Sequence, residues 1–130
     1  MRYFVNTVSR DHVQAGAAGG FTQADHGRET RLKRLAKGDA LVFYSPRVGF
    51  TAIAEVVDET PYQEEGSEQW RRRAKFATAS ETPIAPLLEQ LEFIRNKQAW
   101  GVVFRRGFFE IGESDFRKIA AAMGVGSVSS

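Results

Sequence analysis

The sequence predicts an α+β domain or a small barrel with covering helices, because the expected strands outnumber the helices and no βαβ rhythm repeats. Its 130 residues are a common size for one domain, and 42% hydrophobic against 26% charged residues is an ordinary globular balance. We therefore expect one domain over residues 1–124, followed by a flexible tail over residues 125–130 that carries no stabilising pattern.

Alternation along residues 3–8 and 70–78 and short apolar runs elsewhere, such as residues 40–44, predict the strands. They are expected at residues 3–8, 40–44, 50–57, 70–78, 102–104 and 108–111. The second and third should pair as a hairpin, because only a short turn separates them. Residues 58–69 are acidic and rich in turn formers, so we expect an exposed loop there.

Helix signals are fewer and shorter. Ser9 suits the N-cap of a short helix that runs through Val13 and ends at the glycines near Gly16. Residues 30–36 predict a short basic helix. Apolar residues at offsets of 0, 3, 4 and 7 predict two more, which bury Ile84, Leu87, Leu88 and Leu91 in one and Phe116, Ile119, Ala120 and Met123 in the other.

Composition excludes several classes of function. The chain has no cysteine, which excludes disulfides, thiol nucleophiles and cysteine-ligated zinc. No apolar run approaches the length that spans a membrane, and the first residues lack the features of a signal peptide. We therefore expect a cytoplasmic protein with no membrane partner.

Positive charge is clustered although the formal net charge is only +2. The sequence pI is 9.2. Segregated cations are typical of a surface that faces a polyanion, and ordinary solvated lysines and arginines are the alternative. The clusters are Arg28, Arg31, Lys33, Arg34 and Lys37; Arg71, Arg72, Arg73 and Lys75; and Arg105 with Arg106.

Motifs of catalysis and of cofactor binding are missing. Each histidine follows an aspartate, in Asp11-His12 and Asp25-His26, but neither pair has the spacing of a metal site. Gly16, Gly19 and Gly20 match neither phosphate-loop pattern, and no serine lies in a nucleophile elbow. We expect no catalytic constellation, no metal and no cofactor.

Asn6 and several aromatic residues leave two interpretations open. Asn6 shares a strand face with apolar residues, so its amide either bonds to backbone or lines a polar pocket. Aromatic rings near the ends of elements and beside cations either pack in the core or stack on bases. Trp70, followed by three arginines, is the best local example of that combination.

Several segments resemble the EVE domain, a member of the PUA-like superfamily. They are RYFVNTVSRDHV, GGFTQADHG, LKRLAKGDALVFYSP, FTAIAEVVDETPYQ and FIRNKQAWG followed by RRGFFEI. The resemblance covers nearly the whole chain and is to the short, single-domain prokaryotic type. It implies a PUA-like twisted β-barrel with covering short helices and a ligand cleft at one mouth.

The resemblance also implies non-catalytic binding of DNA or RNA. EVE domains are regarded as readers of modified bases such as 5-methylcytosine, and the related YTH domains read methylated adenine. A nuclease or modification enzyme acting in trans is a further implied partner. In the YTH family a cage tryptophan closes the loop after the first helix, and Phe21 stands at the matching position with Thr22 after it.

Carried onto this chain, the resemblance gives candidate site residues. The expected base-binding cleft comprises Asn6, Ser9, Phe21, Thr22, Gln23, His26, Tyr44, Ser45, Trp70 and Trp100. The expected phosphate-binding residues are Arg28, Arg31, Lys33, Arg34, Arg47, Arg71, Arg73, Lys75, Arg105 and Arg106. Two alternatives stay open: a small-molecule or hydrolase-like function that uses Asp25 and His26, and a module that binds another protein.

Overall fold

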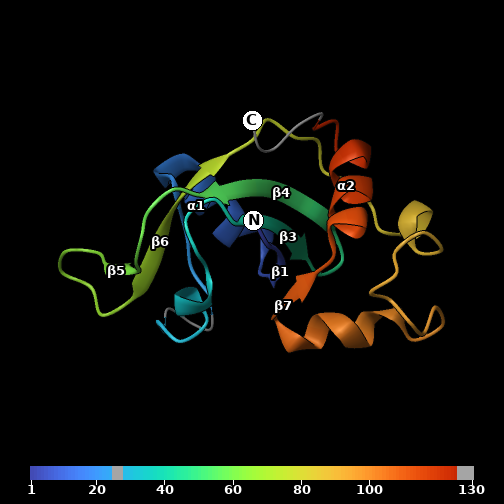
Figure 1. Ribbon diagram of the computed structural model, residues 1–130, viewed down its shortest axis with the longest axis horizontal. Coiled ribbons are helices and arrows are strands. Elements are labelled where there is room, and N and C mark those ends of the chain that lie inside the picture. The colour runs from blue at the N-terminus through green and yellow to red at the C-terminus, as the bar shows by residue number, and fades with distance from the viewer. Residues whose placement is uncertain (25–27, 126–130) are drawn as a thin grey trace.

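One mixed sheet forms the centre of the computed structural model, which describes residues 1–24 and 28–125. Its strands are β1 (Tyr3–Thr7), β2 (Phe21–Thr22), β3 (Ala40–Ser45), β4 (Gly49–Val56), β5 (Tyr62–Gln63), β6 (Trp70–Phe76) and β7 (Phe108–Ile111). The order is β2-β6-β4-β3-β1-β7, with the short β5 paired to β6. The strands curve strongly (Figure 1), yet within the described residues the sheet stays open. The α+β class is confirmed, and the expected barrel is incomplete.

Parallel pairing occurs once in this sheet, between β1 and β3. Thr7 at the end of β1 lies opposite Tyr44 near the end of β3. The other strand pairs are antiparallel, including the predicted hairpin of β3 and β4. The carboxyl ends of β1 and β3 therefore meet at one edge of the molecule, and the loops that leave them lie side by side.

Helical segments cover both faces of the sheet. They are the α-helices α1 (Arg10–Gly19) and α2 (Glu113–Ala122) and the 3-10 helices η2 (Leu32–Arg34), η3 (Ala85–Leu87) and η4 (Trp100–Arg106). Val5, Val42 and Tyr44 pack with residues of η3, η4 and α2 on one face. Phe4, Leu41 and Phe43 pack with α1 and η2 residues on the other. Two buried faces explain why β3 is apolar along its whole length.

The first helix is longer than predicted. Ser9 caps α1 as expected and accepts a hydrogen bond from the backbone N–H of His12. The helix does not end near Gly16 but continues to Gly19, and Gly20 closes it in the left-handed conformation at φ 72°. Position 16 has no room for a side chain, because a Cβ on Gly16 would lie 2.4 Å from the carbonyl oxygen of Phe21.

The predicted helix after Pro83 is wrong as a continuous element. The structure has only the 3-10 turn η3 there, although Ile84, Leu87 and Leu91 are buried as the spacing predicts. Pro86 has no N–H to give to a helix. The backbone N–H groups of Glu92 and Phe93 instead donate to the buried carboxylate of Asp115, at 2.9 and 2.8 Å.

Two other expectations need correction. Residues 102–104 are not a strand; they lie inside η4, which turns Phe104 onto Tyr44, while β7 follows as predicted. The acidic segment 58–69 is mainly loop as expected but includes β5. Val125, the first residue of the predicted tail, is buried against the core, and residues 126–130 lie outside the described chain.

Arg72 belongs to the predicted basic cluster but not to the surface. Its side chain is fully buried, and it forms an ion pair with Asp58 at 2.6 Å. The guanidinium also donates to the carbonyl oxygens of Leu32, Leu35 and Asp58. Arg72 therefore ties β6 to η2 and is not available to a phosphate.

Candidate functional site

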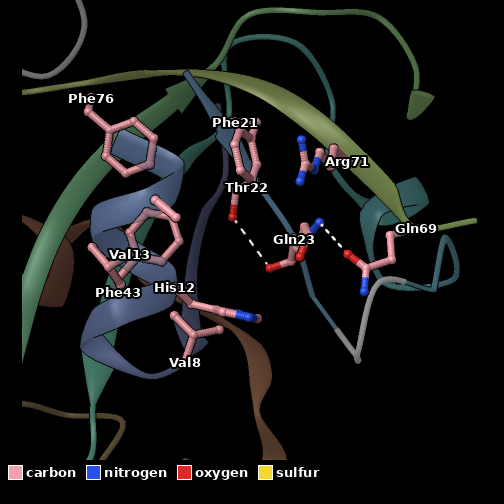
Figure 2. A pocket seen from close by; sticks show the side chains of 11 residues that line it. Val8, His12, Val13, Phe21, Thr22, Gln23, Phe43, Gln69, Arg71 and Phe76 are labelled. Carbon is pink, nitrogen blue, oxygen red and sulfur yellow. Dashed lines mark hydrogen bonds between the residues drawn. The ribbon is translucent and has the colours of Figure 1, made fainter. Parts of the chain in front are cut away.

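The residues after the first helix line a pocket of about 180 Å³ between α1, β2 and β6, here called the Phe21 pocket. Three phenylalanines form its apolar part, and a histidine, two glutamines, a threonine and an arginine supply polar atoms (Figure 2). It is lined by Val8, His12, Val13, Ala15, Phe21, Thr22, Gln23, Phe43, Gln69, Arg71 and Phe76. Of the ten expected cleft residues, it therefore contains Phe21, Thr22 and Gln23.

Phe21 is half-buried and is held between a cation and the helix end. The Arg71 guanidinium lies 3.7 Å from the centroid of the ring, and it pairs with Glu64 at 2.7 Å. In the view of Figure 2, Arg71 and Phe76 lie on opposite sides of the Phe21 ring. The Arg71 Nε is buried and finds no hydrogen-bond partner among the described residues. This donor is therefore a buried group in the wall of the pocket that the described chain leaves unsatisfied.

Asn6 does not line the Phe21 pocket, but it holds two residues that do. It is buried, and its amide Nδ2 donates to the carbonyl oxygen of Gln23 at 2.9 Å and, more weakly, to the Thr22 hydroxyl at 3.4 Å. Of the two interpretations of this amide, the bond to backbone is therefore observed. Asn6 positions the two residues that face the pocket.

Gln23 and Gln69 close the pocket on the side of β6. The Gln23 Nε2 donates to the Gln69 Oε1 at 3.1 Å, which leaves the remaining amide atoms of both side chains for a ligand. The His12 side chain points toward the same opening in Figure 2. A planar ring in this pocket would meet apolar faces at its sides and amide or imidazole groups at its edge.

Two glycines allow this arrangement. A Cβ on Gly19 would lie 2.6 and 2.8 Å from Phe21 ring atoms, so the ring packs directly on the helix backbone. Gly20 then reverses the chain, and its carbonyl oxygen accepts from the N–H of Ala74 in β6. The glycine pair thus fixes where Phe21 stands.

Tyr44 and Trp100 line a different pocket, of about 380 Å³, here called the Trp100 pocket. The Tyr44 and Phe104 rings stack with centroids 3.8 Å apart, and Trp100 meets Phe104 edge to face. Burial raises the pKa of the Tyr44 hydroxyl above its ordinary value. The pocket is lined by Thr7, Tyr44, Pro46, Arg47, Trp100, Gly101, Phe104 and Arg105.

Ser9 lies between these two pockets in an open hollow of about 510 Å³, here called the Arg47 hollow. Thr7, Arg47 and Pro46 also line the Trp100 pocket, and Val8 also lines the Phe21 pocket. The hollow therefore joins the two. Its lining residues are Thr7, Val8, Ser9, Arg10, Asp11, Pro46, Arg47 and Val48.

The other expected cleft residues lie elsewhere. Ser45 is buried, and its hydroxyl shares a hydrogen bond of 2.9 Å with Thr51, so it does not reach a pocket. Trp70 is half-buried at the start of β6, packs on the core and lines none of the three pockets. His26 lies outside the described residues, as does Asp25. The residues expected to form one cleft are thus distributed over the Phe21 pocket, the Trp100 pocket and the Arg47 hollow, and some line none of these.

The candidate phosphate-binding residues differ in how they are engaged. Lys33 pairs with Glu29 at 3.4 Å, and Arg31 packs over Gly107. Four others lie over aromatic rings: Arg34 over Phe4 and Phe108, Arg71 over Phe21, Arg73 over Tyr62, and Arg106 over Phe109. The side chains of Arg28, Arg47, Lys75 and Arg105 have neither an ion pair nor a hydrogen bond with the described part of the chain.

Sequence reasoning missed His12, Gln69 and the pocket role of Phe76. Extending the helix beyond Val13 would have placed His12 and Ala15 on one face, three residues apart, next to Val8. Gln69 carried no signal, because only the fold brings residue 69 opposite residue 23. Within residues 1–24 and 28–125, no group of three or more metal-ligating side chains occurs and no helix is long and apolar enough to cross a membrane.

Comparisons with known proteins agree with this architecture. The model of the EVE domain matches residues 2–122. A UPF0310 protein of Mycobacterium avium (strain 104) is 45% identical over 135 residues, an alignment that covers 95% of this chain and 98% of that protein.

Solved structures with low sequence identity share the fold. The YTH domain of the Zygosaccharomyces rouxii MRB1 protein, in complex with N6-methyladenosine RNA, superimposes with a TM-score of 0.70 at 19% identity and covers 92% of this chain and 84% of that one. Human THYN1, in complex with DNA that contains 5-methylcytosine, superimposes with a TM-score of 0.57 at 14% identity. This alignment covers 93% of this chain and 96% of that one. These likenesses confirm the PUA-like fold.

Proposed function

The chain belongs to the EVE domain family, and from this we propose that it binds a nucleic-acid strand and takes one modified base into the Phe21 pocket. The observation that carries the proposal is the pocket itself, where aromatic walls and amide edges meet beside a buried arginine donor that has no partner among residues 1–24 and 28–125. Two structural neighbours support it, since each was solved in complex with a methylated nucleic acid.

The pocket has room for one ring. An apolar protein cavity of about 150 Å³ holds a benzene molecule, and the Phe21 pocket measures about 180 Å³. Entry of a base from a duplex requires extrusion, which costs a few kcal/mol and less where pairing is already weak. Stacking on an aromatic side chain returns about 1–3 kcal/mol per base, so single-stranded or weakly paired sites are favoured.

In this proposal, the polar residues that line the pocket recognise the edge of the bound base. Gln23 and Gln69 offer both donors and acceptors, and the buried Arg71 Nε, unsatisfied within the described chain, is a further donor in the pocket wall. Val8 and Val13 provide apolar surface for a methyl group. Burial of one methyl contributes about 0.8 kcal/mol, which corresponds to roughly a fourfold preference over the unmodified base.

The experiment compares binding of labelled single-stranded and duplex DNA and RNA, each with one 5-methylcytosine, one N6-methyladenine or no modification, by fluorescence anisotropy. Wild type should prefer one modified strand. Phe21→Ala should weaken that strand by about 5- to 150-fold, the equivalent of one lost stacking contact.

Tyr62→Ala is the matched control for Phe21→Ala. Tyr62 is also half-buried on a two-residue strand paired to β6 and also carries an arginine over its ring, 4.5 Å from the centroid, but it lines no described pocket. Thermal melts establish that both variants fold. Equal binding of all strands by wild type, or equal loss in both variants, would reject the proposed function.

A further inference from the structure

The Trp100 pocket has the components of a second nucleotide site. Its floor is the stacked pair of Tyr44 and Phe104, and Trp100 is a half-buried wall set at 78° to the Phe104 ring. Arg47 and Arg105, both exposed, stand at its rim and have no ion-pair partner among the described residues. A planar ring with a phosphate attached matches an aromatic site with a cationic rim.

Two local features concern the Trp100 pocket directly: a buried hydroxyl and the turn that carries one rim cation. The Thr7 Oγ1 is buried yet finds no hydrogen-bond partner within residues 1–24 and 28–125, and Thr7 lines this pocket. Arg47 has φ 69° because it is the third residue of the β-turn Ser45-Pro46-Arg47-Val48, which is closed by a hydrogen bond of 3.0 Å from the Val48 N–H to the Ser45 carbonyl oxygen. A buried hydroxyl without a partner costs free energy. Thr7 and Arg47 both line the Trp100 pocket, and the turn fixes the backbone that carries Arg47.

Strand geometry relates this pocket to the Phe21 pocket. Consecutive residues of a strand point to opposite faces, and Phe43 lines the Phe21 pocket while Tyr44 lines the Trp100 pocket. At the end of β1, Val8 and Thr7 divide in the same way. The pockets therefore open on the two faces of the sheet at one edge, and the Arg47 hollow connects them around that edge.

We propose that the Trp100 pocket binds a second nucleotide of the same strand, so that the strand passes from the Phe21 pocket around the carboxyl ends of β1 and β3. The inference rests on the proposed function. The second base stacks in the aromatic pocket, Arg47 and Arg105 face its phosphates, and the Thr7 and Tyr44 hydroxyls bond to its polar edge. Asp11 is the acidic residue of the connecting hollow, and Arg10 there is engaged with Glu81.

The two tryptophans of the chain make the test specific. A Trp70→Phe variant leaves Trp100 as the sole tryptophan, and a Trp100→Phe variant leaves Trp70, which lines neither pocket. Each is titrated with the preferred modified strand while the anisotropy of the strand and the tryptophan emission are followed together. We expect saturable quenching of Trp100 at the midpoint of the anisotropy curve and unchanged emission of Trp70.

Substitution separates the second site from the first. Trp100→Ala should weaken the strand by about 5- to 150-fold and leave binding of the free modified nucleoside unchanged, whereas Phe21→Ala should weaken both. A strand that binds with its modified-base preference while Trp100 emission stays constant would overturn the second site and leave the proposed function standing. Binding of no strand would overturn both. Quenching of Trp100 by a free mononucleotide as strong as by the strand would assign the pocket to free nucleotides instead.

Discussion

At the scale of single residues, the arginines of β6 show that adjacent identical side chains do different work. Arg71 lies over Phe21, Arg73 lies over Tyr62, and Arg72 between them is fully buried. Strand alternation sends Arg72 inward, where Asp58 and three carbonyl oxygens satisfy its donors. Arg72 thereby anchors the strand that presents Arg71 to the pocket.

Replacement of Arg72 should cost stability. Arg72→Ala leaves the Asp58 carboxylate and the carbonyl oxygens of Leu32 and Leu35 without their partner, and removal of one member of a buried ion pair costs about 3–5 kcal/mol. Urea denaturation measures the loss. Arg73→Ala, an exposed change on the next residue, should stay within about 0.5 kcal/mol. A small effect at Arg72 would contradict the anchoring role.

At the scale of elements, the end of α1 sets the position of the Phe21 ring. A Cβ on Gly19 would fall within 3 Å of two Phe21 ring atoms, so the ring must move if Gly19 becomes alanine. The helix itself tolerates the change, because alanine has the higher helix propensity.

Gly19→Ala should therefore impair binding more than folding. We expect the modified strand to bind several-fold more weakly, up to the loss of about 1–3 kcal/mol given by one stacking contact, while the melting temperature changes little. Gly112→Ala is the control, since a Cβ there meets nothing within 4 Å. Unchanged affinity in Gly19→Ala would show that the ring position does not matter.

Local patterns predicted most elements, and non-local contacts account for the rest. Ser9 identified the start of α1 but not its end, and the spacing of Phe116, Ile119 and Ala120 identified α2. The spacing after Pro83 predicted burial but not conformation, because the Asp115 carboxylate competes for backbone N–H groups from more than twenty residues away. For the candidate site, the GGFT motif predicted that Phe21 and Thr22 line a pocket. The place of Gln69 in that pocket, and the separation of Tyr44 from Phe21 into different pockets, follow only from the tertiary structure.

At the scale of the whole molecule, the one parallel strand pair of the described chain determines where the three hollows form. Because β1 and β3 end together, side chains from both faces of the sheet reach one edge, and three adjoining hollows form there. Crevices at the carboxyl ends of parallel strands are common ligand sites in open sheets. Arg47 and Arg105, which have no ion-pair partner in the part of the chain that the structure describes, stand at this edge, while Lys37 and Arg117 are held in ion pairs elsewhere.

Salt dependence tests whether position or net charge controls binding. The double variant Arg47→Gln/Arg105→Gln and the control Lys37→Gln/Arg117→Gln each remove two positive charges, so the formal net charge falls from +2 to 0 in both. The first removes two proposed phosphate contacts, and on a single strand each contributes about 0.7 to the slope of log K against log salt. We expect that slope to become shallower by about 1.4 in the first variant and to stay near wild type in the second, measured by anisotropy between 50 and 200 mM salt. Equal changes in both variants would mean that the overall field attracts the strand and that the edge of β1 and β3 holds no phosphate.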